Sequence, residues 1–188
     1  MKEGIMMNSI KNKALLIQAV IGAILITVLL IPFQALTPYA PYTWMIFIPL
    51  VLFFSLGGEP KLLPAMFLSF LSGTLWGVVF FFFVGLMAGL SMDIVFGVLT
   101  TVIIFGILAI HPILLGKTPF GIVPCVLIGF IESLFTFLIK PSNVSSVGSI
   151  QLIMFFGYGI ALSFILVKVN VLFCKLALGN NWAKSFNE

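Results

Sequence analysis

The chain is divided into about six apolar segments by short polar breaks, and this division limits its fold more than any other feature. Hydrophobic residues make up 62% of the 188 residues and charged residues only 7%, whereas soluble domains carry about 25% charged residues. A helix that crosses the hydrocarbon core of a bilayer, roughly 30 Å thick, needs about 20 apolar residues. The sequence therefore predicts an all-α, polytopic membrane helix bundle with about six transmembrane helices.

The segments differ in length, and the differences predict irregular helices. They cover residues 14–31, 43–56, 62–90, 94–115, 120–139 and 150–167. Pro32 follows the first segment and is expected to end its helix. The second segment would form a helix of about 21 Å, which is short for a full crossing, and the third one of about 43 Å. We expect the third helix to be tilted, or broken near Gly85 and Gly89.

The positions of the lysines predict the orientation in the membrane, since the chain has no arginine. If the N-terminus is cytoplasmic, the outer flanks hold Lys140 alone. The inner flanks then hold Lys2, Lys11, Lys13, Lys61, Lys117, Lys175 and Lys184. This bias predicts a multipass protein of the cell inner (plasma) membrane with both termini in the cytoplasm. Lys168 is expected at the inner headgroups, with residues 169–178 along the inner interface.

The lengths of the polar breaks predict one membrane domain. Residues 1–13 are expected to form a cytoplasmic N-terminal segment, residues 14–178 a single transmembrane helical domain, and residues 179–188 a cytoplasmic C-terminal tail. The net charge of +4 is explained by attraction to the anionic inner leaflet, so no nucleic-acid partner is expected. We expect no enzyme, because no two titratable residues share a depth at which they could act together.

The residues that commonly bind metals are too scattered to predict a metal or another cofactor. Cys125 and Cys174 lie in separate apolar segments without the spacing of a metal site, and both are expected to be buried thiols. His111 is the only histidine in the chain, and a single histidine cannot form a multi-histidine site. It precedes Pro112 near the inner end of its segment, where we expect an interfacial position.

Glu132 is the one acidic residue that the sequence places deep in the membrane. Counted along its helix, it lies about 18 Å from the inner edge of the segment and about 10 Å from the outer edge. No lysine is an obvious partner, and an ionised carboxylate without a partner is costly there. We expect a protonated carboxyl group or one that faces a polar cavity inside the bundle. A neutral hydrogen bond to a neighbouring helix is the alternative.

Small and polar residues follow one face of the third helix and one face of the fifth. Gly73 and Gly77 have the G-x-x-x-G spacing that allows two helices to approach closely, so close packing is the first interpretation of this face. A polar interior or a solute path between the two helices is the second. The candidate residues are Ser69, Gly73 and Gly77 on the third helix and Cys125, Gly129, Glu132 and Thr136 on the fifth.

Several short motifs connect the chain to a known family. In order, they are Trp44, Gly57-Gly58 with Lys61, Ser72-Gly73 followed by Trp76, and Pro124 with Ile128-Gly129. In these motifs the chain resembles the domain-of-unknown-function family 1097 of small bacterial inner-membrane proteins, from about Tyr42 to Leu178. The resemblance implies a multipass bacterial membrane protein and supplies neither an activity nor a site.

Three classes of function are compatible with these features. The first is a channel or facilitator for a small, weakly polar solute, with its site between the third and fifth helices. The second is the substrate-binding membrane subunit of a vitamin-type transporter, for which the chain length, the basic inner face and Ala19-x-x-x-Ala23 are suitable. The third is a structural or regulatory membrane protein that transports nothing. The expected partners are the lipid bilayer, a small-molecule solute, and either a second copy of the chain or a partner membrane subunit.

Overall fold

The computed structural model describes residues 2–87, 89, 91–138, 147–180 and 182–186, and no strand occurs among them. Four helical stretches are long and apolar enough to cross a membrane. They are Ser9–Leu36, Pro60–Leu86, Met92–Leu115 and Ser149–Leu178. The predicted all-α, polytopic membrane fold is confirmed. Lys140, which the sequence places outside, lies beyond the described residues, so the orientation stays a prediction.

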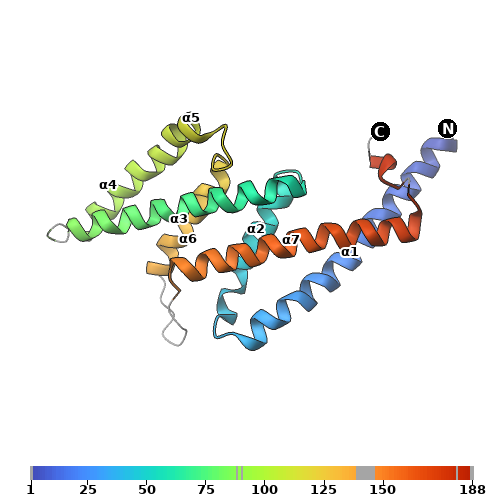
Figure 1. Ribbon diagram of the computed structural model, residues 1–188, viewed down its shortest axis with the longest axis horizontal. Coiled ribbons are helices and arrows are strands. Elements are labelled where there is room, and N and C mark those ends of the chain that lie inside the picture. The colour runs from blue at the N-terminus through green and yellow to red at the C-terminus, as the bar shows by residue number, and fades with distance from the viewer. Residues whose placement is uncertain (1, 88, 90, 139–146, 181, 187–188) are drawn as a thin grey trace. The chain divides into compact units, whose positions relative to one another are not determined.

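The helices follow the apolar segments closely (Figure 1). They are α1 (Lys2–Leu36), α2 (Thr43–Ser55), α3 (Leu63–Leu86), α4 (Met92–Phe105), α5 (His111–Leu115), α6 (Val123–Leu138) and α7 (Ser149–Leu178). Four short segments accompany them: η1 (Ala40–Tyr42), η2 (Pro60–Leu62), η3 (Gly106–Ile110) and η4 (Trp182–Phe186). With 13 residues, α2 is as short as predicted, and α6 has only 16. A sixfold crossing of the membrane stays a prediction.

Two predicted helix ends are wrong. The first helix continues through Pro32 to Leu36, because a proline removes one hydrogen bond while the apolar surroundings favour keeping the others. The third helix ends at Leu86, between Gly85 and Gly89, which is where the sequence predicted a break for a helix that is not tilted. The last helix does not end near residue 167 but continues past Lys168 to Leu178, whereas the position of residues 169–178 along the inner interface stays a prediction.

Contacts divide the chain into two compact units, residues 1–40 with 161–188 and residues 41–160. In the first unit, the Cys174 thiol lies 3.8 Å from the carbonyl oxygen of Ala14. The ammonium group of Lys11 lies 5.7 Å from the centre of the Phe186 ring, which joins η4 to α1. Cys125, in the second unit, is fully buried, as is Cys174. The prediction of two buried thiols is therefore confirmed.

The second unit, residues 41–160, is built around α3, which contacts α2, α4 and α6 (Figure 1). Phe80 is the centre of one apolar cluster, with edge-to-face ring contacts to Phe96 at 5.1 Å and to Phe130 at 5.9 Å. The buried residues of this cluster are Phe80, Val84, Val95, Leu99, Ile103, Ile107, Val126 and Phe130. They come from α3, α4, η3 and α6, so this cluster joins α4 and α6 to α3.

The part of α7 that belongs to the second unit packs against α2 and α3. Phe156 stacks on Phe70 with ring centres 3.9 Å apart and planes at 12°. A Cβ atom at Gly159 would overlap the ring of Pro49 and the carbonyl oxygen of Ile46. Only a glycine allows α7 to approach the α2 backbone this closely.

Helices α3 and α6 touch backbone to backbone. A Cβ atom at Gly73 would overlap the carbonyl oxygen of Val126 and would stand 3.0 Å from Cα of Gly129. A Cβ atom at Gly129 would overlap the carbonyl oxygen of Phe70. Further along both helices, Gly77 faces Ser133, so α3 and α6 run parallel. The close packing predicted from the G-x-x-x-G spacing is present.

The replacement Gly73→Ala should destabilise the protein, because the added methyl group has no space between the two backbones. Overpacking of this kind typically costs about 1–3 kcal/mol. Gly85→Ala, in the same helix, is the matched control, since a Cβ atom there meets nothing within 4 Å. Thermal unfolding in mild detergent should show a lower midpoint for Gly73→Ala and an unchanged or slightly higher one for Gly85→Ala. Equal midpoints for the two variants would contradict the contact.

Candidate functional site

The loop before α6 is attached to α3 by Ser69. The Ser69 hydroxyl is fully buried. It donates to the carbonyl oxygen of Pro119 at 3.2 Å and accepts the backbone N–H of Ile122 at 3.0 Å. Both bonds join residues far apart in sequence, so they fix the loop against the helix. Ser69 therefore belongs to the polar interior that the sequence predicted, with a structural role that the sequence did not indicate.

The loop that Ser69 holds presents a carbonyl group to His111. Phe120 lies between the two residues that Ser69 contacts, and its carbonyl oxygen is 2.8 Å from Nε2 of His111. The His111 side chain is only 3% exposed. The predicted position at the depth of the membrane interface stays a prediction. The ring is held inside the second unit, between α5 and the loop before α6.

His111 continues the buried face of α4 and η3. The buried residues Val95, Leu99, Ile103 and Ile107 recur every four positions. The next position of this series is His111, which is also buried, whereas Ile110 is 47% exposed.

The segment η3 is π-helical, and the His111 N–H bonds to the carbonyl oxygen of Gly106, five residues back. A π-helical turn contains more residues than an α-helical turn, and this one ends directly before His111.

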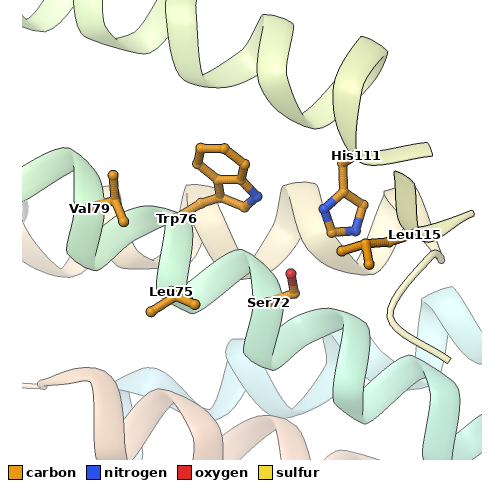
Figure 2. A pocket seen from close by; sticks show the side chains of 6 residues that line it. All are labelled: Ser72, Leu75, Trp76, Val79, His111 and Leu115. Atoms are coloured by element: carbon orange, nitrogen blue, oxygen red, sulfur yellow. The ribbon is translucent and has the colours of Figure 1, made fainter. Parts of the chain in front are cut away.

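A cavity of about 310 Å³ lies between α3 and the inward-facing His111 (Figure 2). Its lining residues are Ser72, Leu75, Trp76 and Val79 from α3 and His111 and Leu115 from α5. The walls are therefore mostly apolar. A Cβ atom at Gly106 would stand 3.3 Å from the Trp76 ring, so the glycine in the π-helical turn leaves space for the indole.

Three polar groups converge on this cavity. Figure 2 shows the indole nitrogen of Trp76 pointing toward the His111 ring, and the Ser72 hydroxyl pointing toward the space beside them. Neither Ser72 nor Trp76 has a hydrogen-bond partner for its side chain among the described residues. An apolar cavity with a few converging polar groups is the usual form of a small-molecule site. The sequence analysis did not select Ser72, Trp76 or His111 as candidates.

Glu132 lies inside the second unit, as its predicted depth suggested. Its side chain is 1% exposed, and neither carboxyl oxygen has a hydrogen-bond partner among the described residues. The elements α2, α3 and η3 pack against α6, and none of them contains Asp, Glu, Lys, Arg or His. These neighbours supply no counter-charge. Protonation of the carboxyl group stays a prediction.

The hydroxyl groups near Glu132 on α6 do not donate to it, because both are bonded to backbone carbonyls. The Ser133 hydroxyl donates to the carbonyl oxygen of Gly129 at 2.8 Å, and the Thr136 hydroxyl donates to that of Ser133 at 3.0 Å. Cys125 is fully buried. The structure therefore places Gly73, Gly77 and Gly129 in a packing contact and Glu132 in the interior. A role of these residues in a solute path stays a prediction.

The long apolar helices and the small polar interior define a polytopic helical membrane protein. Its chain belongs to the family described as protein of unknown function (DUF1097), whose model matches residues 16–179. The resemblance inferred from the motifs is confirmed, and the match also includes most of α1, which those motifs did not cover. No curated protein and no solved structure matches the chain.

The replacement Glu132→Met should stabilise the protein, because a buried carboxyl group without a partner is costly while a methionine of similar length suits an apolar interior. Mutational data put the cost of such an unsatisfied polar group at about 1–3 kcal/mol. Thermal unfolding in detergent measures the change. Glu59→Gln is the control, since Glu59 lies in an exposed turn and pairs with Lys61. A loss of stability in Glu132→Met would mean that the carboxyl group has a structural partner.

Proposed function

We propose that the protein is a channel or facilitator for a small, weakly polar solute, and that the solute binds in the cavity between α3 and α5. The observation that supports this most is the cavity itself, in which the side chains of Ser72, Trp76 and His111 converge between apolar walls (Figure 2). A solute with one small polar group could exchange hydrogen bonds with water for hydrogen bonds with these residues. Its apolar part would contact Leu75 and Val79.

The proposed site lies on a different face of α3 from the one that the sequence indicated. At Gly73 and Gly129 the backbones of α3 and α6 are in contact, and this leaves no room for a solute at that crossing. In our proposal, Gly73, Gly77 and Gly129 hold α3 against α6, while Ser69 fixes the loop that orients His111. These residues would support the solute site without contacting the solute.

The volume of the cavity favours a facilitator over a vitamin-binding subunit. Ligand pockets usually measure about 300–1,000 Å³, and about 310 Å³ is near the lower limit. A water molecule takes about 30 Å³ of liquid volume, so the cavity suits a solute of about ten heavy atoms or fewer better than a larger vitamin.

Filling the cavity should stop the flux. We expect proteoliposomes with the parent protein to re-swell faster than empty liposomes after an osmotic step with at least one of glycerol, ethylene glycol, urea and acetamide. Val79→Phe places a ring at a position that lines the cavity and should return the rate to that of empty liposomes. Stopped-flow light scattering measures these rates.

Val78→Phe is the matched control, since the neighbouring Val78 is 50% exposed on the outside of α3 and does not line the cavity. Its flux should equal that of the parent. Thermal unfolding of both variants separates a blocked cavity from a failure to fold. Parent flux no faster than that of empty liposomes for all four solutes would contradict the facilitator. Equal flux in Val79→Phe and Val78→Phe would contradict this cavity as the path.

A further inference from the structure

The hydrogen bond between His111 and the loop before α6 determines which ring nitrogen can meet a solute. Nε2 lies 2.8 Å from the carbonyl oxygen of Phe120. A carbonyl oxygen only accepts hydrogen bonds, so Nε2 carries the hydrogen. In a neutral imidazole the other nitrogen, Nδ1, is then an acceptor. Figure 2 shows Nδ1, the nitrogen next to the carbon that joins the ring to the side chain, on the side that faces Trp76.

Trp76 supplies the complementary group. Its indole Nε1–H can only donate, and it points toward His111 across the cavity (Figure 2). A solute between the two rings therefore meets a donor on one side and an acceptor on the other. The Ser72 hydroxyl can do either. A solute satisfies both rings at once only if it offers an acceptor to Trp76 and a donor to His111.

The charges around the cavity exclude an ionised group. None of its six lining residues is Asp, Glu, Lys or Arg. The nearest lysine in the sequence, Lys117, is exposed in the loop beyond Leu115. An ion in an apolar cavity without a counter-charge is costly. A carboxylic acid, which is ionised at neutral pH, is therefore a poor match, whereas an amide remains uncharged.

We propose that the cavity recognises a primary amide or urea-type group, whose carbonyl oxygen accepts from Nε1–H of Trp76 and whose N–H donates to Nδ1 of His111. Such a group carries the acceptor and the donor on neighbouring parts of one small, planar, uncharged unit. This inference rests on the proposed function, because it names the class of solute for the same cavity. It adds a requirement for a donor that a general site for weakly polar solutes does not have.

Acetamide and acetone test this requirement. The two molecules have nearly the same shape and both carry a carbonyl acceptor, but only acetamide has an N–H donor. We expect the full-length protein in detergent to bind acetamide at least about tenfold more tightly than acetone, because acetone leaves Nδ1 of His111 without a partner. Saturation-transfer NMR titrations of each molecule, with competition between the two, measure the ratio. Val79→Phe should abolish binding of both, and Val78→Phe should preserve it.

Two variants test which side chain donates to the solute and which accepts from it. Trp76→Phe removes the N–H donor and should weaken the binding of acetamide and of acetone by a similar factor. Trp44→Phe is its control, since Trp44 lies on α2, outside the cavity. His111→Phe removes the acceptor and should bring the acetamide-to-acetone ratio close to one. If His111→Phe fails to fold without its bond to Phe120, the ratio of acetamide to acetone affinity in the parent protein still tests the donor requirement.

The possible results separate this inference from the proposed function. If acetone binds as tightly as acetamide, and Val79→Phe abolishes both, the cavity is a solute site without a donor requirement, and only the amide inference is overturned. If acetamide does not bind, the amide inference is overturned as well. The glycerol and ethylene glycol fluxes then test the facilitator independently of any amide.

Discussion

The contact between the backbones of α3 and α6 at Gly73 and Gly129 is the interaction on which the second unit depends. Two apolar helices in lipid gain little from the hydrophobic effect by associating, because lipid tails are as apolar as their side chains. Their association depends on close van der Waals packing, which small residues allow. The two glycines bring the backbones together over a stretch where any side chain would overlap the neighbouring chain. The position of α6, and of the loop before it, depends on this contact.

The candidate site is a consequence of the same contact. With α6 against α3, Ser69 reaches both Pro119 and Ile122, and the loop between them presents the carbonyl oxygen of Phe120 to His111. Four hydroxyl groups of α3 and α6, those of Ser69, Thr74, Ser133 and Thr136, donate to backbone carbonyls. Ser72 has no partner among the described residues, and it faces the cavity. In a membrane, polar groups without partners are the usual indication of a functional region.

The sequence predicts the features that depend on composition and on regular spacing. The apolar segments predicted the helices, the spacing of Gly73 and Gly77 predicted close packing, and the position of Glu132 predicted its burial. Helix ends were predicted less well, because neighbouring helices and the apolar surroundings decide whether a helix continues past Pro32 or ends at Leu86. The inward position of His111 continues the four-residue spacing of Leu99, Ile103 and Ile107, which the sequence-based expectation of an interfacial histidine did not use. The π-helical turn before it is not predicted by a regular 3.6-residue period.

The isotope-edited NMR spectrum of His111 is the most direct test of the site, because the chain contains a single histidine and its ring nitrogens need no further assignment. With ¹⁵N-labelled histidine, we expect one protonated and one unprotonated ring nitrogen, with the proton on Nε2. Addition of acetamide should shift the Nδ1 signal and leave Nε2 bonded to Phe120. A proton on Nδ1, or signals that do not respond to acetamide at saturating concentration, would contradict the assignment of this cavity as a solute site oriented by the loop before α6.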